Sequence, residues 1–114
     1  MSRDLPHLLD IWQAAHKIKS LTQNVSRDDF MQDEMRHAAA IYQLIIVGEA
    51  TKRISSEFRG QNPAIPWKQM AGMRDVLIHS YNDVDLELVW EAATQSIPDL
   101  IAWIEPLLPP TDAQ

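Results

Sequence analysis

Cysteine is absent from this sequence of 114 residues, which excludes disulfide bonds and thiolate metal sites. Glycine is scarce, with 3 residues, while 46% of the chain is hydrophobic, a balance that fits a compact helical protein. No apolar run approaches the roughly 20 residues that a membrane span needs. The start, Ser2-Arg3-Asp4, shows no signal-peptide core. The sequence therefore predicts one soluble, cytoplasmic domain with one core and no contact with a membrane.

Positive charge is also in short supply. The chain has 10 Lys and Arg against 16 Asp and Glu, and its formal net charge is -6. Generic nucleic-acid binding draws on clustered Lys and Arg, so this balance counts against a broad nucleic-acid-binding surface. A nuclease with this composition must concentrate its few cations in a groove or bind RNA weakly. An acidic surface could also face a basic partner.

Patterns that bind metals or activate a serine are missing as well. There is no His-x3-His pair and no cluster of carboxylates, and Arg36-His37 is an isolated pair on an expected helix. His7 and His16 are interpreted as surface polar residues. Ser80 has no base and orienting group beyond its neighbour His79, which argues against a serine nucleophile. We expect no metal and no cofactor.

Hydrophobic periodicity predicts four helices. The first follows a Ser2 or Asp4 cap, with Pro6 in its first turn, and fades by Gln23-Asn24. The second runs from a cap at Ser26 to about Phe58, and its middle, residues 38–50, is apolar almost all round. Such a helix must be covered on more than one side.

The third helix starts at Pro66, after a break at residues 59–63, and ends near Ile78 or His79. Its Gly72 would allow another helix to approach closely. The fourth is capped by Asp85, kinks at Pro98 and continues its apolar pattern to Pro109-Pro110. The expected fold class is all-α, an antiparallel up-and-down four-helix bundle with a kinked last helix. A single domain spans residues 1–114, with a core over about 5–108 and a loose C-terminal tail.

The candidate chemistry lies in residues 74–81, Arg-Asp-Val-Leu-Ile-His-Ser-Tyr. The guanidinium of Arg74 can fork onto phosphate oxygens. The imidazole of His79, with an unperturbed pKa of about 6.5, suits proton transfer near neutrality. Together they form a minimal set for breaking a phosphodiester without a metal. Without further context, the same residues would be a helix end with a surface Arg, a C-terminal His and a packed Tyr81.

The spacing within this set is informative. Five residues correspond to about 500° of rotation on a regular helix, so Arg74 and His79 lie about 140° apart. They converge only if the helix ends before His79 or if a second copy of the chain completes the site. We expect both, and therefore a homodimer whose cleft is built from two chains.

The motif Arg-x4-His-x-Tyr resembles the signature of HEPN-domain ribonucleases, specifically the HepT toxin branch. Other segments match around it: Gly48-Glu49-Ala50, Ile65-Pro66-Trp67, Gly72-Met73, Val84-Asp85 and Val89-Trp90. The short Arg/His pattern alone is weak, but the set in this order is strong. The resemblance covers about residues 5–108.

The resemblance implies a metal-independent endoribonuclease toxin of a type VII-like toxin–antitoxin pair. His79 would deprotonate the RNA 2′-OH and Arg74 would stabilise the pentacoordinate phosphorus. The RNA substrate would be tRNA or another RNA. The partner would resemble the minimal nucleotidyltransferase MntA, an antitoxin that neutralises such toxins by transferring AMP to the motif tyrosine, here Tyr81.

Two further residues belong to this interpretation. Asp75 departs from the family, which often has Asn there; its charge would weaken phosphate binding or orient Arg74. Glu49 lies in an apolar stretch and needs a partner if it is ionised and buried, with Arg74 and Tyr81 as candidates. It could equally point to solvent or pair with Arg53. The rival function is a catalytically silent helical dimer that serves as a binding subunit for a nucleotidyltransferase.

Overall fold

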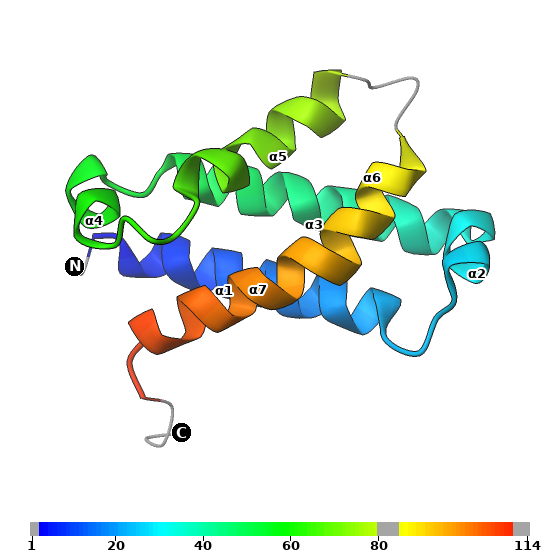
Figure 1. Ribbon diagram of the computed structural model, residues 1–114, viewed down its shortest axis with the longest axis horizontal. Helices are drawn as coiled ribbons and strands as arrows, with labels where there is room; N and C mark the ends of the chain where they lie inside the picture. The colour runs from blue at the N-terminus through cyan, green and yellow to red at the C-terminus, as the bar shows by residue number, and fades with distance from the viewer. Residues whose placement is uncertain (1–2, 80–84, 111–114) are drawn as a thin grey trace.

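The computed structural model describes residues 3–79 and 85–110, and for residues 74–79 it describes the backbone alone. Every regular element in this part of the chain is helical. Four long helical runs follow one another with alternating direction, so consecutive runs lie antiparallel (Figure 1). The predicted all-α, up-and-down bundle is confirmed. The predictions for the C-terminal tail beyond Pro110 lie outside the described residues.

The first run is α1, Leu5–Thr22, which carries Pro6 in its first turn as predicted. Its buried face consists of Leu8, Ile11, Ala14, Ala15, Ile18 and Thr22. Asp4 is the N-cap residue, but its carboxylate does not cap α1. Oδ1 instead accepts the N–H of Ser55 at 2.7 Å, and Oδ2 accepts the Ser55 hydroxyl at 2.8 Å. Asp4 thus joins the start of α1 to a distant turn.

The second run, predicted as one helix over about 26–58, is broken into three. These are α2 (Arg27–Gln32), α3 (Glu34–Lys52) and α4 (Ser56–Gln61). The single-helix prediction is therefore wrong, although α3 alone contains the apolar stretch on which it rested. About 19 residues at 1.5 Å each make α3 roughly 28 Å long.

Side-chain caps explain where these helices begin. Ser26 precedes α2, Asp33 precedes α3 and Ser55 precedes α4. In each case a side-chain oxygen accepts the backbone N–H of the residue three positions later, at 3.0 to 3.1 Å. Such bonds satisfy N–H groups that have no partner within the helix. The predicted cap at Ser26 is confirmed, and the other two caps create the breaks.

The third run is α5, Trp67–His79, which begins directly after Pro66. The break before it is shorter than predicted, because α4 continues through Gln61 and ends at its cap Asn62. Trp67 and Met70 are buried, and Met73 is half-buried. This face of α5 packs against α3.

The fourth run consists of α6 (Leu86–Glu91), a π-helical segment η1 (Ala92–Ser96), α7 (Ile97–Ile104) and a 3-10 turn η2 (Glu105–Leu107). Asp85 caps it as predicted, since its carboxylate accepts the N–H of Glu87 at 2.9 Å. The run changes direction between α6 and α7 (Figure 1). Pro98 lies in the first turn of α7, where its ring and missing N–H are tolerated. The π segment just before it re-routes the backbone bonds at the predicted kink.

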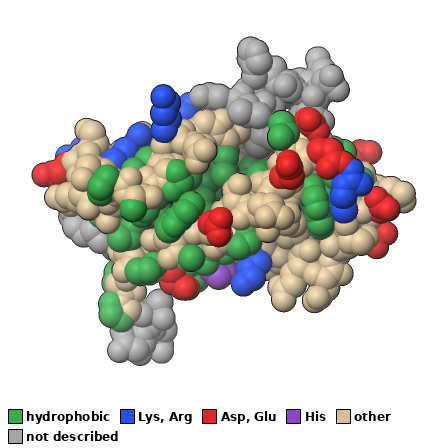
Figure 2. Space-filling view, viewed as in Figure 1, with side chains coloured by type: hydrophobic (Ala, Val, Ile, Leu, Met, Phe, Trp, Pro, Cys, Tyr) green, Lys and Arg blue, Asp and Glu red, His purple; other side chains and the backbone are tan. Residues whose placement is uncertain are grey.

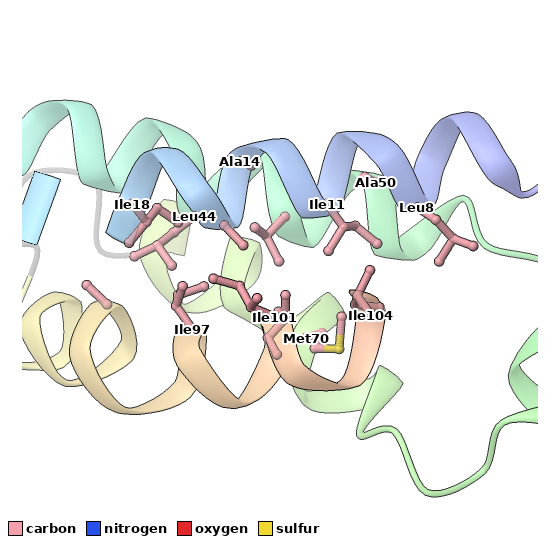
Figure 3. Packing of buried hydrophobic residues seen from close by; sticks show 14 of the residues in the cluster. Leu8, Ile11, Ala14, Ile18, Leu44, Ala50, Met70, Ile97, Ile101 and Ile104 are labelled. Atoms are coloured by element: carbon pink, nitrogen blue, oxygen red, sulfur yellow. The ribbon is translucent and has the colours of Figure 1, made fainter. Parts of the chain in front are cut away.

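Apolar side chains from the four runs meet in one core between α1, α3 and α7. α5 packs against α3 and adds buried side chains to this core. Ile11, Leu44, Ile97 and Met70 represent the four runs (Figure 3). α7 packs against α1, while α5 packs against α3. α6, at the start of the last run, also touches α3, and a groove lies between the last run and the motif helix.

Candidate functional site

The start of α5 is held firmly. The indole Nε1 of Trp67 donates to the backbone oxygen of Asn62 at 2.9 Å. The Trp67 ring meets the ring of Phe58 edge-on, with centroids 6.1 Å apart. The carbonyl of Pro66 accepts the N–H of Met70 at 3.0 Å. These contacts fix the direction of the helix that carries the motif.

The last described residues of α5 carry two positions of the motif. The helix runs through His79, the last described residue before the gap at 80–84, so the predicted end near Ile78 or His79 stays a prediction. Positions 74 and 79 are therefore both helical and lie about 140° apart. A helix that ends before His79, the first of the two expected routes to convergence, is not found. Completion of the site by a second copy remains as the other route.

The two positions fall on different faces of α5. Position 74 lies four residues after Met70 and seven after Trp67, both of which are buried against the core. Position 79 lies seven residues after Gly72, which lines the groove beside α5. The side chains of Arg74, Asp75 and His79, and all of Tyr81, lie outside the described residues, so their predicted contacts stay predictions.

Glu49 lies on α3, the helix against which α5 packs. It is half-buried and takes part in an interaction within the structure. The alternatives for Glu49, which are contact with Arg74 or Tyr81, pairing with Arg53 and a side chain directed to solvent, stay predictions.

Several cations away from the motif serve the fold. Arg27 pairs with Asp28 on its own helix and with Glu87 on α6. Arg36 pairs with Asp33 and donates to the backbone oxygen of Leu21 at 2.8 Å. Arg59 donates to the backbone oxygen of Thr51 at 2.7 Å. These arginines link helices to one another, so RNA binding must depend on other cations.

A groove lies beside α5, between it and the run of α6, η1 and α7. Its volume is about 770 Å³, and Leu44 of α3 lies among its lining residues. Gly72 lines this groove, and a Cβ built there would meet no atom within 4 Å. Within the described part of this chain no helix packs closely on Gly72, so close approach of another helix stays a prediction for a second copy only. The sequence alone does not reveal the groove, because its two walls belong to separate helices.

No three His, Asp or Glu side chains among the described residues gather closely enough to hold a metal ion. Among the described helices, none combines the length and apolar character that a membrane span requires.

Comparison with known proteins now decides the family. Residues 11–107 match the protein family described as ribonuclease HepT-like. The chain belongs to this family. It is 40% identical over 101 residues to a protein of Thermococcus cleftensis named "Probable ribonuclease HepT", covering 89% of this chain and 92% of that protein.

A second relative of this HepT-like chain, from Caldanaerobacter subterraneus subsp. tengcongensis, is named "Putative RNase". It is 35% identical over 108 residues, which cover 95% of this chain and 96% of the relative. No solved structure gives a significant match. Family membership confirms the predicted HepT resemblance and the assignment of the chain to a class of ribonucleases.

Proposed function

We propose that this HepT-like protein is a metal-independent endoribonuclease whose active site is shared by two copies of the chain. The observation that carries the proposal is the position of Arg74 and His79 on one continuous helix, α5, in a member of a ribonuclease family. The two positions are about 140° apart, which favours a site completed by a second α5.

The proposed reaction is an internal transesterification. The imidazole of His79 removes the proton of the RNA 2′-OH, and the 2′-oxygen attacks the adjacent phosphorus. The bond from phosphorus to the 5′-oxygen breaks, and that oxygen takes a proton from His79 of the partner subunit. The products are a 2′,3′-cyclic phosphate and a 5′-hydroxyl. Arg74 stabilises the charge on the pentacoordinate phosphorus, and Asp75 orients Arg74.

An uncovered face of α3 supports the two-chain site. Met35, Ala38 and Tyr42 recur at spacings of three and four residues and are exposed, Met35 by 85% and Tyr42 by 62%. They form one stripe along the helix. We call these three residues the α3 stripe. The sequence predicts that the apolar middle of this helix packs against other elements on more than one side. Within one chain, nothing packs over the α3 stripe among the described residues.

The finer biological role rests on the resemblance to HepT toxins. We propose that the protein is the toxin of a toxin–antitoxin pair and cleaves tRNA or another RNA. Its partner is a minimal nucleotidyltransferase of the MntA type, which transfers AMP to Tyr81. The added phosphate carries negative charge and pairs with Arg74, where the RNA phosphate would otherwise bind.

The test is cleavage of RNA by the purified protein in EDTA. The wild type should cut RNA, and His79→Ala and Arg74→Ala should each lose about 10²–10⁴-fold in rate. Lys68→Ala is the matched control, because Lys68 is an exposed cation on the same helix; it should lose less than tenfold. Acid treatment should open the terminal cyclic phosphate and change the mobility of the product in a gel.

Two results would contradict the proposal. One is cleavage that disappears when the metal is chelated, and the other is a His79→Ala protein as active as the wild type. A protein that binds a nucleotidyltransferase but never cleaves RNA would favour the catalytically silent dimer. Growth arrest that depends on His79 fits the enzyme alone.

A further inference from the structure

The groove beside α5 is uncovered and largely apolar. Met70 and Met73 of α5 form one wall, Leu88 and Trp103 lie along the other, and Leu44 lies among the lining residues. Figure 2 shows hydrophobic side chains gathered in this hollow between α5 and the last run. Leu88 is 47% exposed and Trp103 is 38% exposed, so water meets large apolar surfaces here. Contiguous exposed apolar surface of this kind marks a binding site.

The groove has the dimensions of a helix-binding site. Its second wall runs from Leu88 to Trp103. A straight α-helix over these 15 residues would be about 22 Å long, and the π segment and the bend between α6 and α7 make the wall shorter than that. The wall therefore suits a bound helix of up to about four turns. Residues at positions 88, 92, 99 and 103 line this wall at roughly helical spacing, which suits a partner with anchors at similar spacing. The half-buried Met73 provides an apolar surface that adapts to the anchors.

The charge of the groove has one sign. Glu91 and Asp99 line it, and no Lys or Arg occurs among its described lining residues. Neither carboxylate forms an ion pair that would neutralise it among the described salt bridges. A segment that fills this groove must therefore bring cations to its edges.

Three other occupants fit less well. RNA would place phosphates beside Glu91 and Asp99, which repel them. A second copy that docked the same groove by two-fold symmetry would bring four carboxylates together. A small apolar molecule would fill part of the groove but leave the carboxylates without partners. A basic amphipathic helix satisfies both the apolar walls and the carboxylates.

We propose that the groove between α5 and the α6–α7 run docks an amphipathic helix of another protein, with apolar side chains against Met73, Leu88 and Trp103 and Lys or Arg beside Glu91 and Asp99. The site does not depend on ribonuclease activity. Position 79 shares a face of α5 with Gly72 in the groove, so a docked helix would run toward the proposed catalytic base.

The test measures binding of fluorescein-labelled helical peptides of about four turns by fluorescence anisotropy. The first probe is built from Leu and Lys with an amphipathic pattern, and the second replaces every Lys with Glu. The Leu/Lys peptide should bind the full chain with a micromolar Kd, at least tenfold more tightly than the Leu/Glu peptide. Glu91→Lys with Asp99→Lys should weaken binding of the Leu/Lys peptide tenfold or more.

The matched control is Asp10→Lys with Glu105→Lys, which reverses two exposed carboxylates outside the groove and changes the net charge equally. This control should keep its affinity within about twofold, as should His79→Ala. Leu88→Ser should weaken binding without a change of charge. Circular dichroism establishes that each variant is folded.

Several outcomes would overturn the proposal. Equal loss in the control pair would mean that net charge attracts the peptide without a groove. Equal binding of the two peptides, or none, would remove the basic helix as occupant. If Leu88→Ser abolishes binding of a labelled RNA instead, the groove belongs to RNA. If Leu88→Ser converts a dimer into a monomer by light scattering, the groove is an interface between copies.

Discussion

Tyr81 follows His79 by two residues in the sequence, and we predict that its hydroxyl reaches the same cleft. If AMP transfer to Tyr81 neutralises the toxin, Tyr81→Phe should keep ribonuclease activity but escape the nucleotidyltransferase. Co-expression with a nucleotidyltransferase partner, followed by mass spectrometry, should show one or more AMP units on the Tyr81 peptide of the wild type. The His79→Ala protein, which keeps Tyr81, should still be modified.

Neutralisation without modification would give a different result. If the Tyr81 peptide stays unmodified while the partner still abolishes cleavage, inhibition proceeds by binding alone. Tyr81→Phe would then be neutralised as well as the wild type. In that case the basic-helix groove, which is independent of Tyr81, would be the first surface to examine.

Asp4 and Ser55 connect two elements, the start of α1 and the start of α4. Burial raises the pKa of the Asp4 carboxyl. The hydrogen bonds from Ser55 and the nearby positive charge of Arg3 lower this pKa by more than burial raises it, so the net shift is downward from 3.8. A group with a depressed folded pKa stabilises the fold above its unfolded pKa of about 3.9. This stabilisation is lost as the pH falls through the folded pKa.

Asp4→Asn should therefore lower the free energy of unfolding at pH 7 by about 1–3 kcal/mol, since a charged acceptor of two hydrogen bonds is removed. The difference from wild type should shrink below about pH 4, where the wild-type carboxyl also takes up a proton. Urea unfolding at pH 7 and pH 3 measures both. Asp10→Asn, an exposed change on the same helix, should have little effect at either pH. A constant difference across this pH range would disprove the role of the Asp4 charge.

Sequence patterns predicted elements better than the breaks between them. The caps at Ser26 and Asp85 follow from local chemistry, and the structure has both. The breaks at Asp33 and Ser55 were missed because no Gly or Pro marks them. Their signal was present: each is a strong N-cap residue followed within two positions by Glu.

The candidate site was predictable only where one helix determines it. The angle between positions 74 and 79 follows from helix geometry, and the prediction of a second copy rests on that angle. The groove depends on the distance between α5 and the last run, and this distance cannot be predicted from the sequence of either helix alone. Trp103 illustrates this, because it continues an apolar pattern yet is 38% exposed at the groove.

At the scale of the whole molecule, the excess of negative charge disfavours general RNA binding. The net charge is -6, and three of the arginines are engaged in contacts between residues of the fold. A second copy would bring a second set of motif cations into one cleft, although the rest of that copy is acidic as well. Dimerisation would therefore give this acidic chain a local positive site, and we expect RNA binding there to weaken sharply as salt rises.

The α3 stripe should form the interface between the two copies. Wild-type protein at micromolar concentration should scatter light with twice the 13.0 kDa mass of one chain. Met35→Glu with Tyr42→Glu should place carboxylates at the interface and give the single-chain mass. RNA cleavage should fall at least tenfold in this variant, because each site would lose the partner subunit's His79.

Leu9→Glu is the control, since Leu9 is also an exposed apolar residue but lies on α1, outside the α3 stripe. It should remain a dimer and keep its activity. Dimeric Met35→Glu/Tyr42→Glu protein would move the interface to another face of the molecule. A wild-type protein that is monomeric at micromolar concentration and still cleaves RNA would refute the shared site, because one α5 would then supply both Arg74 and His79 despite their separation of about 140°.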